Sequence, residues 1–291
     1  MTIEYLADPT SLPDFTIPHV EGQSALSCPV VTVAAPAPAL RVHAPEAAAL
    51  VAGASVGEAT CACKGKKKPC LFVHGVGNKD SSAPTPTFSE SWGDIQNSAP
   101  CCSSVAFAHY ESVLRGWTRK DVQTEFCNTA LKVGTSGGKT IDNMILVTFS
   151  MGNLIASGAF ANGTCNIGSG VTWVSIAGPM QGSKASNLLE EKCTSGGWSA
   201  TLGVFGYCPA TESYLQMKYQ DTVDASLKKA YLDAQTARKR ANKLMCGIKS
   251  SGLASTDGAA LALVGSMAFK DGSLHDGNRL VRLFTENELH A

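Results

Sequence analysis

The residues best suited to chemistry surround Ser150. The sequence TFSMG at positions 148–152 follows a continuous apolar run, Asn143–Phe149, and precedes a segment with helix-like apolar spacing, Gly152–Phe160. This pattern predicts a strand, a tight turn with serine at its apex, and a helix. A serine held in this way can attack an acyl carbon once a base takes its proton. The motif departs from G-x-S-x-G at Thr148, and a core serine at a strand end is the structural alternative.

A second glycine turn supplies what such a nucleophile needs. HGVG at 74–77 directly follows the apolar run Cys70–Val73, which predicts a buried strand ending in a turn. Acyl transfer creates an oxyanion, and backbone N–H groups are its usual donors. We expect the N–H groups of Val76 and Met151 to fill this role. His74 is expected to stabilise the turn rather than to act as the base.

Alternating strands and helices must position these two turns. Val105–His109 and Val171–Ala177 predict further strands, and Trp117–Leu131 has the apolar spacing of a helix. The strands near the serine are continuous apolar runs rather than alternating ones. Such strands belong to a parallel sheet covered by helices on both faces, so the sequence predicts an α/β fold.

The chain divides unevenly. Residues 1–68 are rich in proline and alanine without a sustained period, and we expect an N-terminal arm or pro-segment. Residues 69–291 are predicted to form the α/β domain, with an insertion at about 187–250 as a helical cap. Within it, 222–245 reads as a long basic amphipathic helix. We expect a solvated basic face there, with a lid or contact with a membrane surface as the alternative. A further helix is predicted at 252–269.

Composition excludes several classes of protein. Lys plus Arg and Asp plus Glu are 24 each among 291 residues, which argues against a general nucleic-acid binder. No apolar run is long enough to predict a transmembrane segment. The eleven cysteines include no CxxC pair, so disulfides are expected rather than a metal site, with one thiol left over. The sequon at Asn162 also fits a secreted glycoprotein, although 1–18 does not look like a signal peptide.

Four segments together carry a family resemblance. FVHGVGN, VTFSMGNL, VSIAGPMQGS at 174–183 and the Asp-Gly pair at 276–277 resemble the lipase/esterase branch of the α/β-hydrolase superfamily, in its secreted, cysteine-rich form. The similarity extends over about 69–280. It implies an α/β-hydrolase-like fold, a Ser–Asp–His triad in that chain order and cleavage of carboxylic esters through an acyl-enzyme on Ser150. Lipid or acyl esters are the implied substrates, without a metal or organic cofactor.

The acid and the base are less closely defined. Within the resemblance the acid is Asp276, with Asp257 and Asp271 as alternatives. The base is then His290, next to the last residue, and His275 is the alternative if the acid lies earlier. The third alternative is a chain without a competent base, truncated or divergent at its C-terminus. That case implies a catalytically impaired protein that binds a lipid or a protein partner.

Overall fold

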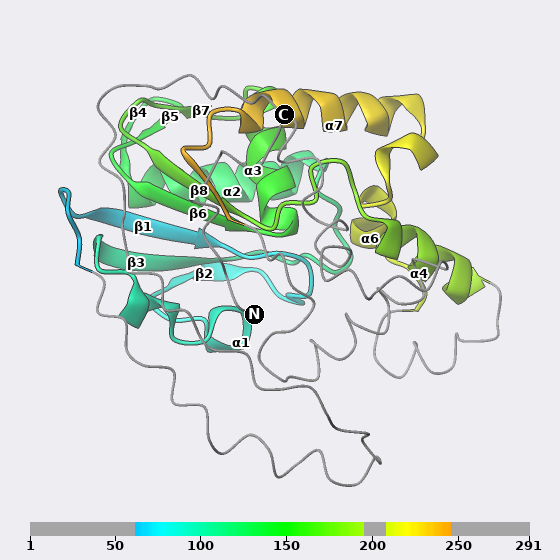
Figure 1. The fold of residues 1–291 in the computed structure, drawn as a ribbon, viewed down its shortest axis with the longest axis horizontal. Coiled ribbons are helices and arrows are strands. Elements are labelled where there is room, and N and C mark those ends of the chain that lie inside the picture. The colour runs from blue at the N-terminus through cyan, green and yellow to red at the C-terminus, as the bar shows by residue number, and fades with distance from the viewer. Residues whose placement is uncertain (1–61, 195–207, 246–291) are drawn as a thin grey trace, which may run out of the picture.

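A mostly parallel sheet forms the centre of the molecule. The computed structural model describes residues 62–194 and 208–245. Six strands follow the order β2-β3-β1-β6-β8-β9, and all neighbours run parallel except β2, which is antiparallel to β3 (Figure 1). The strands are β1 (Lys68–Val73), β2 (Ser82–Thr85), β3 (Cys102–His109), β6 (Ile145–Phe149), β8 (Thr172–Ile176) and β9 (Lys243–Met245).

The continuous apolar runs are explained by burial on both faces of the sheet. In β1, Leu71 and Val73 belong to one core cluster, whereas Cys70 and Phe72 belong to a second. Phe72 lies in register with Phe107 of β3 and with Val147 of β6. Because successive side chains point to opposite faces, only a strand buried on both sides needs such an unbroken run.

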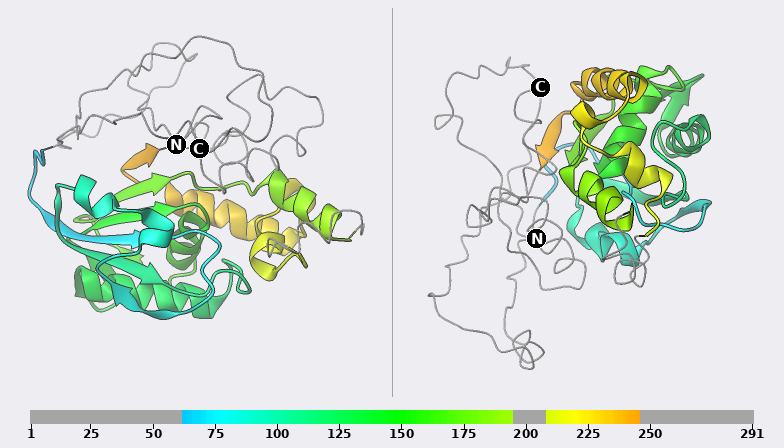
Figure 2. Two further views of the ribbon diagram at one scale, coloured as in Figure 1. Left: turned by 90° about the horizontal axis from the view of Figure 1, so that it is seen from below. Right: turned by 90° about the vertical axis from the view of Figure 1, so that its right-hand side faces the viewer.

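Three long helices cover the face with the larger core. They are α2 (Lys120–Val133), α3 (Met151–Ala161) and α7 (Ala225–Arg238) (Figure 2). The short α1 (Ser89–Trp92) and η2 (Ile95–Ser98) cover part of the other face, where Trp92 packs against Phe72. The α/β architecture predicted from the sequence is therefore confirmed.

The remaining elements lie at the two ends of the strands. A small sheet of β4 (Thr135–Gly137), β5 (Thr140–Asp142) and β7 (Asn166–Ile167) is formed by segments that lead into β6 and β8. At the opposite end, beyond the carboxyl ends of the strands, lie α4 (Lys184–Thr194) and α6 (Glu212–Gln216) (Figure 1). The turn η3 (Gln220–Thr222) then leads into α7.

The long helix predicted over 222–245 is wrong in its extent. It ends at Arg238, and the chain then turns to form β9. Asn242 fixes this turn, because its backbone N–H donates to the carbonyl of Trp173 and its Oδ1 accepts from the N–H of Trp173. Asn242 thereby brings the following residues into the parallel sheet beside β8. The helix predicted at 252–269 lies outside the described residues.

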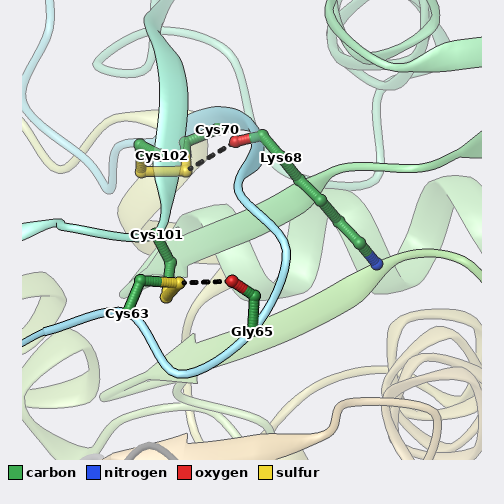
Figure 3. Close-up of a disulfide and its surroundings, with 6 residues drawn as sticks. All are labelled: Cys63, Gly65, Lys68, Cys70, Cys101 and Cys102. Atoms are coloured by element: carbon green, nitrogen blue, oxygen red, sulfur yellow. Dashed lines mark hydrogen bonds between the residues drawn. A yellow bond between two sulfur atoms is a disulfide. The ribbon is translucent and has the colours of Figure 1, made fainter.

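Four disulfides are formed within the described part of the chain. Two of them tie the segment before and within β1 to the start of β3, and these are Cys63–Cys101 and Cys70–Cys102 (Figure 3). Next to them, the Nζ of Lys68 donates to the carbonyl of Gly170 at 2.7 Å. The other two are Cys127–Cys165, which joins α2 to the segment after α3, and Cys193–Cys208.

Candidate active site

Ser150 occupies a strained turn at the carboxyl end of β6. It has φ 50° and ψ −126°, a conformation that costs a non-glycine residue about 1–3 kcal/mol and persists only where the surroundings impose it. Its N–H donates to the carbonyl of Ile176 at the end of β8, and α3 begins at the next residue. The half-buried side chain makes no hydrogen bond to any residue in 62–194 or 208–245. The strand–serine–helix turn therefore leaves the hydroxyl available for reaction.

Two glycines are required by the close approach of β1 to this turn. A Cβ at Gly75 would lie 2.7 Å from the Cβ and 3.1 Å from the Oγ of Ser150. A Cβ at Gly152 would lie 2.6 Å from the carbonyl oxygen of His74. Side chains at these positions would push the two turns apart, so glycine lets the HGVG turn lie directly against the serine.

The two expected oxyanion donors flank this contact. Val76 follows the glycine that touches Ser150, and Met151 is the first residue of α3. The first N–H groups of a helix have no intrahelical acceptor. In the described part of the chain, no hydrogen bond occupies the N–H of either residue. Both donors are thus available beside the serine.

His74 holds the HGVG turn through both ring nitrogens. Its Nδ1 lies 2.7 Å from the carbonyl oxygen of Gly75, and its Nε2 accepts from the N–H of Tyr110 at 3.3 Å. The Tyr110 hydroxyl donates to the His74 carbonyl, and the two rings stack at 4.1 Å. This arrangement requires a neutral imidazole with its proton on Nδ1. Burial lowers the pKa of His74 to about 4, which keeps the ring neutral.

Asn78 anchors the other end of the same turn. Its N–H donates to the Ser112 hydroxyl at 3.0 Å, and its carbonyl accepts from the Ser112 N–H at 2.8 Å. Its side-chain amide donates to the carbonyls of Tyr110 and Asp80. The turn is thus fixed at both ends to the segment that follows β3, and such preorganised backbone donors are what oxyanion stabilisation requires.

Asn153 also contributes to the site, although the sequence motifs did not identify it. This residue is fully buried in α3, and its amide nitrogen donates to the carbonyls of Ser150 and Ile176. The one available signal was its place three residues after the serine. Nearby, Ala177 has φ 47°, a second strained residue at this edge of the sheet.

The expected acid and base are not among these residues. Asp276, His290 and the alternatives His275, Asp257 and Asp271 all lie outside the described residues. The two histidines that the structure does describe are His74, whose ring nitrogens are engaged, and His109. The latter contacts the Thr85 hydroxyl, and burial lowers its pKa. Neither bonds Ser150.

The described residues hold neither a membrane-spanning helix nor a metal cluster. No helix in 62–194 or 208–245 is long and apolar enough to cross a bilayer. Within the same ranges, no three His, Cys, Asp or Glu side chains gather as metal ligands.

Comparisons with known proteins add similarities of fold. No family model and no curated protein matches the chain. Among solved structures, the mature form of a Bacillus licheniformis lipase is 18% identical, with a TM-score of 0.48, over 71% of this chain and 74% of that one. A lipase-esterase related protein from Clostridium acetobutylicum is 20% identical, with a TM-score of 0.32, over 60% and 68%.

A serine hydrolase involved in carbazole degradation is 16% identical, with a TM-score of 0.27, over 60% of this chain and 63% of that one. The chain itself has a mostly parallel sheet flanked by helices, with the serine turn after the central strand β6. This is the mostly parallel α/β arrangement, with a strand–serine–helix turn, that the sequence predicts.

Proposed function

We propose that the protein is a serine hydrolase that cleaves carboxylic esters through an acyl-enzyme on Ser150. One observation carries the proposal: the strained serine turn lies against the HGVG turn, with two unoccupied N–H groups beside a hydroxyl that has no partner in the described part of the chain. A core serine at a strand end would need neither the strain nor the free donors.

The reaction follows from this arrangement. A histidine takes the proton of the Ser150 hydroxyl as the oxygen attacks the ester carbonyl carbon, and the N–H groups of Val76 and Met151 stabilise the oxyanion. The histidine then gives its proton to the leaving alcohol as the C–O bond breaks. Water, deprotonated by the same histidine, then attacks the acyl-enzyme carbonyl carbon. As the bond between that carbon and the Ser150 oxygen breaks, the histidine returns the proton to the serine oxygen and the carboxylic acid is released.

Two acid–base pairs complete the proposal. The resemblance implies Asp276 as the acid and His290 as the base. The alternative pair is Asp257 with His275, and the strand order supports it. In the sheet, β9 ends at Met245 on the same edge as Ser150, and Asp257 follows only twelve residues later, against thirty-one for Asp276.

Acyl or lipid esters are the proposed substrates. Leu114 is 65% exposed in the segment that follows β3, and Leu215 of α6 is 37% exposed. The two segments are joined, because the Ser213 hydroxyl donates to the carbonyl of Val113 at 2.6 Å. Exposed leucines on elements at the edge that holds the serine support an apolar acyl group, and α4 and α6 would act as the cap.

The disulfides favour an oxidising compartment. Four pairs in one part of the chain fit a secreted or extracytoplasmic protein better than a cytosolic one. Asn162 of the sequon is exposed just after α3. Expression through a secretory pathway, followed by glycosidase treatment and mass measurement, tests whether it carries a glycan.

Contact of α7 with a membrane surface is the last element of the proposal. Its lysines are partly neutralised, since Lys228 pairs with Asp221 and Lys229 pairs with Asp233. Sedimentation with anionic phosphatidylglycerol vesicles tests this contact. Binding that persists when both lysines are changed to glutamate would contradict a role for this face.

Labelling of the folded chain tests the activity. A fluorophosphonate should form an adduct on Ser150, located by mass spectrometry, and short p-nitrophenyl esters should be hydrolysed. Both should be lost in Ser150→Ala. His290→Ala and His275→Ala, with the matching asparagine variants of Asp276 and Asp257, then identify the base and the acid. A folded protein without an adduct would instead support a catalytically impaired protein that binds a lipid or a protein partner.

A further inference from the structure

A closed network of side chains lies beneath the serine turn. The Thr148 hydroxyl donates to Oδ1 of Asn153 at 2.5 Å and accepts from the indole N–H of Trp173 at 2.9 Å. The Asn153 amide nitrogen donates to the carbonyl of Ser150 at 3.1 Å and to that of Ile176 at 2.9 Å. Thr148, Asn153 and Trp173 are all fully buried. The hydrogen bonds therefore pair polar side-chain atoms that are not exposed to bulk solvent.

The network connects every part of the turn. Thr148 is the last residue but one of β6, Asn153 lies in the first turn of α3, and Trp173 and Ile176 belong to β8. The side-chain amide of Asn153 donates one hydrogen to the carbonyl of Ser150 and the other to the carbonyl of Ile176. The Ser150 carbonyl also accepts the backbone N–H of Asn153 at 3.0 Å. A carbonyl that accepts both the backbone and the side-chain N–H of Asn153 has little freedom to rotate out of the strained conformation.

The departure from G-x-S-x-G at Thr148 then has a physical reason. A glycine there would leave Oδ1 of Asn153 without the Thr148 hydroxyl and the Trp173 indole without its acceptor. Buried polar groups without partners are costly, so the threonine and the asparagine depend on each other.

We propose that Thr148 and Asn153 are positioning residues for the nucleophile. Asn153 holds the Ser150 peptide in the strained turn, and Thr148 orients the Asn153 amide through its hydroxyl. This inference rests on the proposed function, because positioning has meaning only if Ser150 reacts. A residue that merely stabilises the core would change the unfolding midpoint and leave the reactivity of the folded protein unaltered.

Two substitutions at one position separate these roles. Thr148→Val keeps the shape and removes the hydroxyl, whereas Thr148→Ser keeps the hydroxyl. We expect Thr148→Val to lower kcat for p-nitrophenyl butyrate and the fluorophosphonate labelling rate by about tenfold, with KM unchanged. Thr148→Ser should stay within about threefold of wild type, since it retains both hydrogen bonds. Circular dichroism gives the folded fraction by which each rate is divided.

A third substitution and a matched control extend the test. Asn153→Leu removes the amide that binds both carbonyls and should lower the labelling rate by about a hundredfold, the scale of a misplaced reacting group. The control is Gln123→Met in α2. Gln123 is also a fully buried amide, and it bonds the Trp117 carbonyl and the Asn162 side chain. This variant should lose stability while its folded fraction labels at the wild-type rate.

The outcomes distinguish the two proposals. If wild-type protein forms no adduct on Ser150, the proposed function fails and this inference fails with it. If wild type labels and folded Thr148→Val labels at the same rate, or if Thr148→Ser loses as much as Thr148→Val, only the positioning role is overturned. If Asn153→Leu does not fold, the comparison of Thr148→Val with Thr148→Ser tests the positioning role. If Thr148→Val does not fold either, Thr148→Ala replaces it in that comparison.

Discussion

Replacing Gly75 by alanine should separate the reactivity of Ser150 from the stability of the fold. The new Cβ would lie 2.7 Å from the serine Cβ and 3.1 Å from its Oγ. An ordinary contact between such atoms is about 3.4 Å or longer, so the two groups must move apart by about 0.7 Å. The φ of Gly75 lies outside the left-handed region, so alanine adds a steric clash without backbone strain.

The expected loss of reactivity follows from this displacement. A shift of about 1 Å in a reacting group can cost about a hundredfold in rate, so a shift of about 0.7 Å should cost between tenfold and a hundredfold. The overpacking should lower the free energy of unfolding by about 1–3 kcal/mol. The variant should therefore fold and yet react slowly.

The assay is the second-order rate of fluorophosphonate labelling, with kcat/KM for p-nitrophenyl butyrate measured beside it. Gly137→Ala is the matched control, because a Cβ there meets no atom within 4 Å and Gly137 also lies outside the left-handed region. It should label like wild type. A folded Gly75→Ala variant that labels at the wild-type rate would refute the close approach of the two turns.

Three further perturbations test the elements that support the site. Burial lowers the pKa of His74 from 6.5 to about 4 in the folded protein, so between these two pH values the unfolded chain binds a proton that the folded chain does not. The free energy of unfolding, measured by urea titration, should therefore fall by up to about 3 kcal/mol as pH decreases from 6.5 to 4 and then level off. His74→Gln should lack this pH dependence. Removing Cys127–Cys165, which spans 38 residues, with two serines should cost about 4 kcal/mol in denaturant unfolding. Arg115→Met removes two hydrogen bonds from the guanidinium to the Glu125 carboxylate, at 2.6 and 2.9 Å, and should lower the free energy of unfolding by about 1–2 kcal/mol. A double-mutant cycle with Glu125→Gln that shows no coupling energy would contradict this.

The periodicity of apolar residues along the chain predicted the fold class and the turn at Ser150. The runs that became β1 and β6 are largely apolar without alternation, a pattern typical of a strand buried on both faces. The abrupt change from such a run to Ser150 and a small-residue helix was visible without coordinates. These signals are local, because residues three or four apart already determine them.

The same reasoning failed where a local pattern conflicted with a distant partner. Apolar residues at helical spacing continue through Ala241 and Leu244, yet the helix ends at Arg238. The reason is a pair of hydrogen bonds between Asn242 and Trp173, which lie far apart in the sequence: the Asn242 N–H donates to the Trp173 carbonyl, and the Asn242 Oδ1 accepts from the Trp173 N–H. Helix periodicity contains no information about a vacant sheet edge.

The sequence by itself determined that Ser150 lies between a buried strand and a helix, because the residues on either side of it predict both elements. Only the tertiary structure decided that Gly75 lies against the serine, that Asn153 binds its carbonyl and that Cys127 pairs with Cys165. Contacts of this kind depend on which surfaces the folded sheet and helices bring together. Many arrangements satisfy the same local pattern, and the packing of the whole core selects one of them.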